Sequence, residues 1–479
     1  MNTPKEALKR YFGYDSFRNG QEEIINRTIF DKQHSLVLMP TGSGKSLCYQ
    51  IPALCLDGGT IVISPLIALM QDQVDSLRKK KIPANFINST ISRQEKDKRL
   101  EDFIKGKIKL LYVTPERFRR PDFAEKIKEA NISLLAVDEA HCISEWGHDF
   151  RPDYSRIGEF RQIIGNPLTI ALTATATKDV QKDIVSKLNL KANEVKLFHH
   201  GIDRPNLRLE ALDTYDEKDK LNAILTTIEN YSGSGIIYFS LIQTLEKYAE
   251  MLERKGISFG VYHGKLTDDK RKQMQRDFLS GKQDLILATN AFGMGIDKAD
   301  IRFVIHAEVP SSVEAYYQEI GRAGRDGSPS LCLLLYNQDD LYTQMEFIKW
   351  ANPDADFYSR LFNFLRANLQ AANSMGIEYL REQMHYKTKG DFRIETVLAI
   401  LDRYGVTEGS LENHDLKLTG ELPEILEDDD YLKEKLLSDN KKLLAMVNYF
   451  RNNRCRRVYI SNYFGFTDEK PCGNCDNCV

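Results

Sequence analysis

The stretch Pro40-Thr41-Gly42-Ser43-Gly44-Lys45-Ser46 decides the fold of the first part of this chain. It follows an apolar run at residues 36–39 and precedes a helical pattern. Backbone N–H groups of a Gly-rich loop between a strand and a helix cradle phosphates. A Lys and a Ser at these positions reach the β/γ-phosphates and Mg²⁺. The usual pattern has Gly in place of Pro40, so a plain Gly-rich turn is the alternative. The loop predicts nucleotide binding by Thr41, Gly42, Ser43, Gly44, Lys45 and Ser46.

Apolar runs of strand length surround this loop and alternate with longer helical patterns. The first set lies at residues 36–39, 61–64, 110–113, 134–137 and 169–172. The alternation breaks at residues 201–206 and restarts with runs at 236–239, 259–262, 285–288, 303–306 and 333–335. Near-continuous apolar runs are typical of parallel strands that are covered on both faces. The sequence therefore predicts an α/β protein with two successive doubly wound parallel-sheet domains.

Beyond about residue 340 the strand pattern stops and helical patterns take over. We expect four parts: a first α/β domain at 1–205, a second at 206–345, an inserted region at 346–440 and a small metal-binding subdomain at 441–479. In the inserted region two helical patterns, separated by a polar turn, precede a short alternating run, which is the order of a winged helix. Lys387, Lys389 and Arg393 would then meet nucleic-acid phosphates. The alternative is a helical bolster whose charges lie in water.

Two further groups of charged residues suit phosphate chemistry. Asp138-Glu139-Ala140-His141 follows the predicted strand at 134–137. A carboxylate at a strand end suits Mg²⁺ coordination, and its neighbour can polarise a water molecule. In the second α/β domain, Arg322 and Arg325 would share a face if their stretch is helical. Guanidinium groups suit charge developing on a γ-phosphate, and surface salt bridges are the alternative. If the two domains face each other, these Arg can reach ATP bound at the first.

Four cysteines crowd the C-terminal end of the chain, with the spacing C-x16-C-x2-C-x2-C: Cys455, Cys472, Cys475 and Cys478. Four thiolates suit a closed tetrahedral Zn²⁺ site that would hold a small subdomain folded. An iron–sulfur cluster is the rival, because closely spaced cysteines also suit it. The arginines around the first cysteine either pack on acidic surface or contact phosphates: Arg451, Arg454, Arg456 and Arg457.

Composition excludes several classes of protein. The 479 residues include 66 Lys and Arg against 69 Asp and Glu, a net charge of −3. The chain is therefore not a polybasic tail protein, although a local basic track can still bind nucleic acid. No apolar stretch reaches the roughly 18 residues of a membrane span. Residues 1–11 are charged and lack the apolar core of a secretory signal. We therefore expect a cytoplasmic protein with no membrane partner.

Together these motifs resemble superfamily-two helicases, and RecQ-type DNA helicases in particular, with two RecA-like domains. The segment at residues 12–21, Phe-Gly-Tyr-Asp-Ser-Phe-Arg-Asn-Gly-Gln, resembles the family's adenine-recognition motif. The resemblance implies that Tyr14 stacks on adenine and that Arg18 and Gln21 contact the nucleotide. Residues 173–175, Thr-Ala-Thr, resemble the motif that links ATP hydrolysis to unwinding.

The resemblance also assigns the two arginines of the second domain. Residues 291–298, Ala-Phe-Gly-Met-Gly-Ile-Asp-Lys, resemble the motif that precedes the arginine-finger segment. In the segment that follows, Arg325 would be the finger and Arg322 a second γ-phosphate contact. The cysteine cluster and the neighbouring Asn462-Tyr463-Phe464-Gly465 resemble the RecQ zinc subdomain, which favours zinc over an iron–sulfur cluster.

The most family-specific stretch is residues 141–152, His-Cys-Ile-Ser-Glu-Trp-Gly-His-Asp-Phe-Arg-Pro. It is similar to the aromatic-rich loop that distinguishes RecQ proteins from other helicases. Aromatic rings beside His and Arg can stack on bases and hold phosphate. The resemblance implies a DNA sensor next to the ATP site, formed by Trp146, His148, Phe150 and Arg151. The alternative is a set of core aromatics at a loop corner.

Two departures from the family stand out. Leu241-Ile242-Gln243 occupy positions where the family usually has Asn, Ser and Arg, which leaves a phosphate contact from this motif open. Arg325 and Cys455 are 130 positions apart, more than twice the usual separation in the family, which predicts the insertion described above.

The resemblance implies an ATP-dependent DNA helicase that uses ATP, Mg²⁺ and Zn²⁺. It would move 3′→5′ on single-stranded DNA and unwind duplex DNA in recombination, repair or replication, and we expect a monomer. Lys45 and Ser46 would hold phosphates and Mg²⁺, Asp138 would hold Mg²⁺ through water, and Glu139 would orient the attacking water. The alternatives are an RNA helicase of the same superfamily and a DNA-binding scaffold with a vestigial ATP site.

Overall fold

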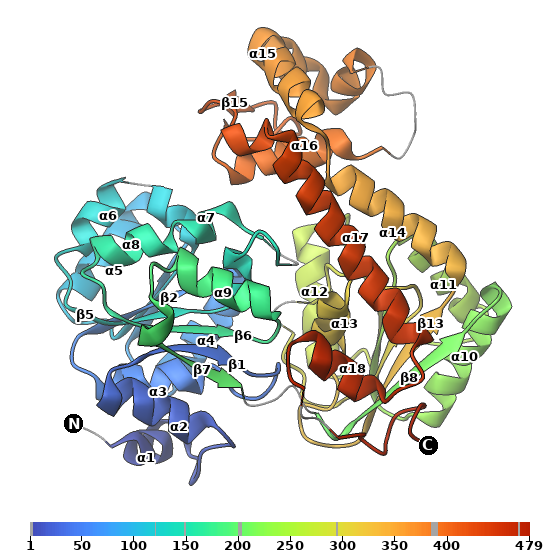
Figure 1. Ribbon diagram of the computed structural model, residues 1–479, viewed down its shortest axis with the longest axis horizontal. Coiled ribbons are helices and arrows are strands. Elements are labelled where there is room, and N and C mark those ends of the chain that lie inside the picture. The colour runs from blue at the N-terminus through green and yellow to red at the C-terminus, as the bar shows by residue number, and fades with distance from the viewer. Residues whose placement is uncertain are drawn as a thin grey trace. The chain divides into compact units, whose positions relative to one another are not determined.

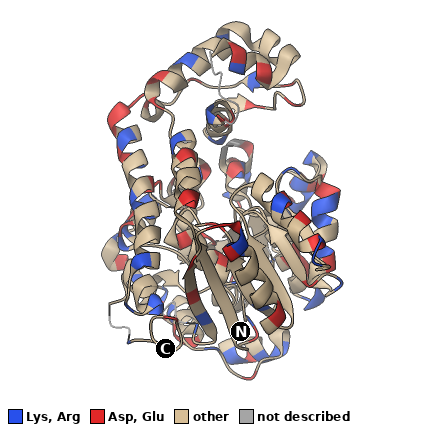
Figure 2. Cartoon of the chain, turned by 90° about the vertical axis from the view of Figure 1, so that its right-hand side faces the viewer, with Lys and Arg blue, Asp and Glu red and all other residues tan. Residues whose placement is uncertain are grey.

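The computed structural model describes residues 3–119, 121–147, 150–199, 204–293, 296–384, 391–467 and 470–479. The chain divides into two compact units (Figure 1). Met1–Asn337 and Tyr449–Val479 form the first, and Gln338–Asn448 form the second. Charged residues of both signs lie on the helices, whereas the strands are mostly uncharged (Figure 2). No helix within the described ranges is long and apolar enough to cross a lipid bilayer.

The first unit begins with a sheet of seven strands in the order β3-β4-β2-β5-β6-β1-β7. All of its strand pairs are parallel. The strands are β1 His34–Leu38, β2 Gly59–Ile63, β3 Ala84–Ile87, β4 Leu110–Val113, β5 Ile132–Val137, β6 Leu168–Thr173 and β7 Val195–His199. The five apolar runs predicted here correspond to β1, β2, β4, β5 and β6.

The two strands that were not predicted, β3 and β7, lie at the two edges of this sheet. An edge strand has one neighbour and more exposed side chains, so it does not need a continuous apolar run. Lys196 and Leu197 in β7 are exposed, and Asn85 interrupts β3. Because polar residues interrupt them, neither strand shows the continuous apolar run by which the other strands were predicted.

Helices cover both faces of this sheet (Figure 1). They are α1 Pro4–Ala7, α2 Gln21–Asn26, α3 Leu47–Cys55, α4 Ile67–Lys79, α5 Arg93–Ile104, α6 Pro121–Ile127, α7 Pro152–Ser155, α8 Ile157–Ile163 and α9 Lys178–Lys187. Because successive strand residues point to opposite faces, Leu36 and Leu38 lie in one apolar core and Val37 and Met39 in the other. Both faces of β1 are therefore buried, which explains its continuous apolar sequence.

The second sheet has six strands in the order β10-β11-β9-β12-β13-β8, again with parallel pairs throughout. The strands are β8 Leu207–Asp213, β9 Ser234–Tyr238, β10 Gly260–Tyr262, β11 Leu285–Ala288, β12 Ile301–His306 and β13 Ser330–Tyr336. Its helices are α10 Glu217–Asn230, α11 Ile242–Glu253, α12 Asp268–Leu279 and α13 Val313–Ile320. The edge strand β8 was not predicted, because Arg208 and Glu210 interrupt its apolar pattern.

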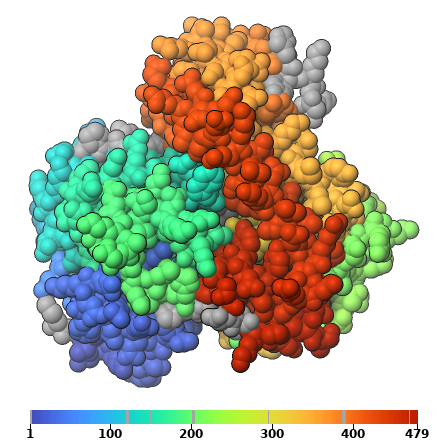
Figure 3. Space-filling model, viewed as in Figure 1, coloured from blue at the N-terminus to red at the C-terminus, as the bar shows by residue number. Residues whose placement is uncertain are grey.

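The C-terminal residues return to this second sheet. The helix α17 Asp429–Arg451 is followed by α18 Arg456–Tyr463 and the last cysteines. The backbone N–H of Asp476 donates to the carbonyl of Leu209, and the Asp476 carboxylate accepts from the N–H of Ala211 at 2.8 Å. The C-terminal segment therefore covers the open edge of β8, and the red C-terminal atoms lie at the surface in the space-filling view (Figure 3). It protects backbone groups that would otherwise be free to pair with another chain.

The second unit contains α14 Gln338–Ala351, α15 Ala355–Gln383, α16 Arg393–Arg403 and most of α17, with a two-stranded antiparallel hairpin of β14 Thr407–Glu408 and β15 Lys417–Leu418. Its core joins the helices to the hairpin through Leu361, Val397 and Leu416. The predicted order of helix, helix and hairpin is present. Arg393, however, is paired with Asp391 at 2.8 Å and lies over the ring of Phe357. Lys387 and Lys389 lie outside the described residues.

Candidate active site and metal centre

The phosphate loop lies between β1 and α3. Gly42 and Gly44 have φ angles of +77° and +84°, and this left-handed conformation favours glycine. The ammonium of Lys45 is buried without a hydrogen-bond partner among the described residues. A buried cation without a partner is costly, so this loop has the chemistry of a site that receives an anion. The phosphate-binding role of these residues stays a prediction.

The segment predicted to contact the nucleotide lies against this loop. Arg18 donates to the carbonyl of Gly42 at 2.8 Å, and Gln21 donates to the carbonyls of Ser43 and Gly44 at 3.2 and 3.1 Å. A Cβ atom on Gly44 would lie 2.7 Å from the Gln21 amide nitrogen. The ring of Tyr14 is 55% exposed, which leaves it accessible for stacking on a base. The tertiary structure thus places the residues predicted to contact adenine next to the residues predicted to contact the phosphates.

Two carboxylates follow β5. Burial raises the pKa of Asp138 to about 6, and the neighbouring charge of Glu139 adds to the rise, while Lys45 opposes it. Glu139 has a φ of +47°, an uncommon backbone conformation for a residue other than glycine. Both carboxylates lie on the phosphate-loop side of the sheet, because parallel strands end at one edge. Asp138 therefore lies where the sequence predicts a Mg²⁺ ligand beside the phosphate loop.

The carboxylate of Glu139 is linked to the predicted coupling motif. It lies 3.3 Å from Nδ1 of His141, and the same nitrogen lies 3.0 Å from the hydroxyl of Thr173. The backbone N–H of Thr175 donates to that hydroxyl at 3.1 Å. A shift of the Glu139 side chain can therefore be transmitted to residues 173–175 through the contact of Glu139 with His141 and the contact of His141 with Thr173.

The two arginines of the second domain follow α13, which ends at Ile320. The expectation that they share a helix face is wrong, because residues 321–327 form turns and Gly324 has a φ of +54°. Arg325 pairs with Asp297 at 2.6 Å, and its Cγ would lie 3.0 Å from a Cβ on Gly42. Arg322 is buried and donates to the carbonyl of Gly293. Of the two, Arg325 lies beside the phosphate loop.

The segment of these arginines contacts the phosphate loop directly. The hydroxyl of Thr41 donates to the carbonyl of Gly321 at 3.0 Å. A Cβ on Gly321 would lie only 2.0 Å from that hydroxyl, so the approach requires glycine. The two RecA-like domains therefore meet at the predicted ATP site.

Arg204 is a residue of this site that sequence reasoning missed. Its guanidinium donates to the carbonyls of Thr41 at 3.1 Å, Ala323 at 2.7 Å and Gly324 at 2.8 Å. Residues 201–206 had been read only as a break between the domains. The only signal was the polar sequence Arg204-Pro205-Asn206 at this break, which is weak without the tertiary structure.

The aromatic-rich loop follows Glu139 through the short helix η4 Ala140–Ile143. Trp146 is partly buried and packs against a core of the first domain. Arg151 donates to the carbonyl of Pro65 at 3.1 Å, and Phe150 is half-buried. His148 lies outside the described residues. The loop therefore lies close along the chain to the catalytic carboxylates, and part of its aromatic surface is used for packing.

The sulfur atoms of the four C-terminal cysteines all lie within 4.8 Å of one another: Cys455, Cys472, Cys475 and Cys478. A tetrahedron of thiolates about 2.3 Å from one ion has sulfur atoms about 3.8 Å apart, and two of the pairs are 4.0 Å apart. An iron–sulfur cluster has several atoms between its thiolates and would hold them farther apart. Burial opposes ionisation of Cys455, but backbone N–H donors outweigh it and lower its pKa to about 7. The donors fit a single Zn²⁺.

Two of the arginines beside this cluster have structural partners. Arg456 is buried, pairs with Asp476 at 2.7 Å and donates to the carbonyl of Tyr449 at 2.7 Å. Arg457 donates to the carbonyls of Arg204 and Leu207 at 3.2 and 3.1 Å. The sequence left two roles open for these arginines, which were packing within the protein and contact with phosphates. The contacts of Arg456 and Arg457 are of the packing kind.

Family models match three parts of the chain. The DEAD/DEAH box helicase model matches residues 18–183, and the helicase conserved C-terminal domain model matches 217–327. The RecQ zinc-binding model matches 422–479, which includes all four cysteines of the cluster.

Solved structures of low identity agree in fold. The DUF1998 helicase MrfA bound to DNA is 18% identical with a TM-score of 0.58, covering 72% of this chain and 50% of that one. The Dbp5 protein of S. cerevisiae bound to RNA and ADP BeF3 is 15% identical with a TM-score of 0.55, covering 72% and 90%. One of these neighbours holds DNA and the other RNA, so the fold alone does not distinguish the two substrates.

Curated relatives decide the family. The "ATP-dependent DNA helicase RecQ" of Bacillus subtilis is 37% identical over all of this chain and 67% of its own length, and that of Haemophilus influenzae is 36% identical over all of this chain and 64%. The chain thus spans about two thirds of these two relatives. The protein of the same name from Synechocystis is 34% identical over 99% of this chain and 98% of its own length. The chain belongs to the RecQ family of ATP-dependent DNA helicases.

Proposed function

We propose that this chain hydrolyses ATP to move 3′→5′ along single-stranded DNA and to unwind duplex DNA, as a monomer acting in recombination, repair or replication. The observation that carries the proposal is the contact of the second domain's arginine segment with the phosphate loop, through Thr41 and Gly321. Because groups of both domains are needed around the γ-phosphate, hydrolysis requires closure of the two domains. Closure and opening that alternate with hydrolysis are the movement that a motor needs.

Each residue of the site has a role in this proposal. The ammonium of Lys45 binds the β- and γ-phosphates, and the absence of a hydrogen-bond partner for it among the described residues supports this role. Ser46 and Asp138 would hold Mg²⁺, which neutralises charge on the phosphates. Glu139 accepts a proton from the attacking water and orients it. In the closed state Arg325 stabilises charge on the γ-phosphate. Arg322, from the same domain, is a second contact to that phosphate.

The DNA sensor is proposed for Trp146, Phe150, Arg151 and His148. The route from Glu139 through His141 to Thr173 supports a link between this loop and the ATP site. DNA that stacks on the loop would shift Glu139 toward its catalytic position.

The decisive experiment measures ATP turnover without nucleic acid, with single-stranded DNA and with RNA of the same sequence. Stimulation by DNA alone supports the proposal. Equal stimulation by RNA would indicate the RNA helicase, and no turnover would indicate the scaffold.

For residues 338–448 we propose a helical bolster rather than a DNA-binding winged helix. The pairing of Arg393 with Asp391 supports this, because a guanidinium held by a carboxylate is less available to phosphate. Changing Lys387, Lys389 and Arg393 together to Ala should leave the salt dependence of DNA affinity unchanged. A slope shallower by up to about three phosphate contacts would favour the winged helix.

A further inference from the structure

The connection between the two RecA-like domains contains a partly buried arginine, Arg204, with an unusual set of partners. All the hydrogen-bond acceptors found for Arg204 in the described part of the chain are backbone carbonyl oxygens. One nitrogen donates to Thr41 in the phosphate loop and to Gly321 at 3.4 Å, and the other donates to Ala323 and Gly324 in the arginine-finger segment. A planar guanidinium presents its donors in a fixed fork, so it sets the distance between these two backbones.

The neighbouring residues hold the same segment. The side-chain amide of Asn206 donates to the carbonyls of Gly324 and Ser328 at 2.8 and 3.0 Å. A Cβ on Gly324 would lie 2.4 Å from that amide, so the chain is closely packed there. Arg204 and Asn206 thus hold the turn just before Arg325 from one side.

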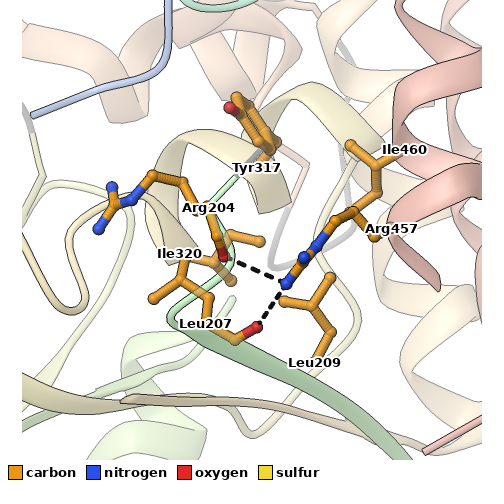
Figure 4. A pocket seen from close by; sticks show the side chains of 7 residues that line it. All are labelled: Arg204, Leu207, Leu209, Tyr317, Ile320, Arg457 and Ile460. Atoms are coloured by element: carbon orange, nitrogen blue, oxygen red, sulfur yellow. Dashed lines mark hydrogen bonds between the residues drawn. The ribbon is translucent and has the colours of Figure 1, made fainter. Parts of the chain in front are cut away.

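The zinc subdomain in turn holds Arg204. Arg457 donates to the carbonyls of Arg204 and Leu207, and Asn474 donates to the carbonyl of Pro205 at 3.4 Å. Figure 4 shows Arg457 reaching these carbonyls across a small pocket whose walls are mainly apolar: Leu207, Leu209, Ile320 and Ile460, with Tyr317 at its side. The connecting segment therefore lies between the zinc subdomain and the arginine-finger segment.

We propose that Arg204 is a positioning residue that sets Arg325 against the phosphate loop, and that Arg457 transmits the folded state of the zinc subdomain to it. The inference rests on the proposed ATPase function, because it assigns Arg325 to the γ-phosphate. In the described part of the chain Arg204 donates to backbone carbonyls. It acts by fixing the carbonyls of Thr41, Ala323 and Gly324, so that the finger meets the γ-phosphate only when the domains are closed.

The test compares binding of ADP with binding of ADP plus aluminium fluoride, a mimic of the phosphoryl-transfer state, in Mg²⁺ and single-stranded DNA. Arg204→Ala should bind ADP within twofold of the wild type, because none of the residues proposed to contact ADP is substituted. Its preference for ADP plus aluminium fluoride should fall at least tenfold, and kcat should fall with little change in KM. Arg204→Lys should behave like Ala, since a single ammonium cannot reach the carbonyls of Thr41, Ala323 and Gly324 at once. Arg208→Ala, an exposed arginine on β8, is the matched control.

Arg457→Ala should reduce the preference for ADP plus aluminium fluoride over ADP to a smaller extent than Arg204→Ala does, while the protein keeps one zinc per chain. In the double variant with Arg204→Ala the two losses should not add, because they act through one path. A wild-type preference in Arg204→Ala or Arg204→Lys, or fully additive losses, would overturn the proposal. If the wild type lacks DNA-stimulated turnover, the proposed function fails, and the binding preference still reports on Arg204.

Discussion

Replacing Asp138 by Asn should stabilise the nucleotide-free protein while it abolishes ATP hydrolysis. The pKa of Asp138 rises from 3.8 to about 6, through burial first and the charge of Glu139 second. Asn has nearly the same shape, does not ionise, and can still accept the hydrogen bond that Asp138 accepts from the N–H of Glu139 at 3.0 Å. Each pKa unit corresponds to about 1.4 kcal/mol, so ionised Asp138 costs the folded protein about 3 kcal/mol at pH 7.

The sign of the pH dependence follows from the direction of the pKa change. The folded protein holds the Asp138 proton more tightly than the unfolded chain between about pH 4 and 6. The stability of the wild type should therefore fall as the pH rises through this window. The advantage of Asp138→Asn should be largest at pH 7 and shrink to roughly half at pH 5.

Urea unfolding at pH 5 and pH 7, without nucleotide, Mg²⁺ or chelator, measures the difference in unfolding free energy between the wild type and Asp138→Asn. Chelator is left out because it would also remove zinc. Asp277→Asn is the control, because hydrogen bonds from Gln273 and Lys282 lower the pKa of this partly exposed carboxylate, so its replacement should bring no gain. An Asp138→Asn protein that is no more stable at pH 7, or equally favoured at both pH values, would refute the reasoning.

Three shorter predictions concern the other parts of the site. Lys45→Ala should abolish ATP hydrolysis and leave DNA affinity nearly unchanged in an electrophoretic mobility assay; persisting DNA-stimulated turnover would remove the phosphate-loop assignment. Trp146→Ala should bind ATP and DNA but lose most DNA stimulation of turnover, and normal unwinding by this variant would leave Trp146 only its packing role. Cys475→Ser should lose zinc, measured by atomic absorption, and become protease-sensitive after residue 451; Cys332→Ser, a buried cysteine outside the cluster, should keep its zinc.

Local patterns in the sequence determined much of this protein. The central strands of both sheets were predictable because burial on both faces demands continuous apolar runs. The phosphate loop and the carboxylates after β5 were predictable because strand–loop–helix chemistry is written in consecutive residues. The cysteine cluster was predictable because its spacing is local except for Cys455. The edge strands β3, β7 and β8 escaped, since one open side relaxes the demand for apolar residues.

Only the tertiary structure decided how these parts meet. Arg204 and Arg457 act through backbone carbonyls, which every residue carries, so no side-chain pattern marks their partners. The contact of Thr41 with Gly321 joins residues 280 positions apart. The expected helix through Arg322 and Arg325 gave way to turns, because a glycine with positive φ sits between them. Long-range packing, rather than local propensity, therefore set the position of Arg325 and of the zinc subdomain beside its segment.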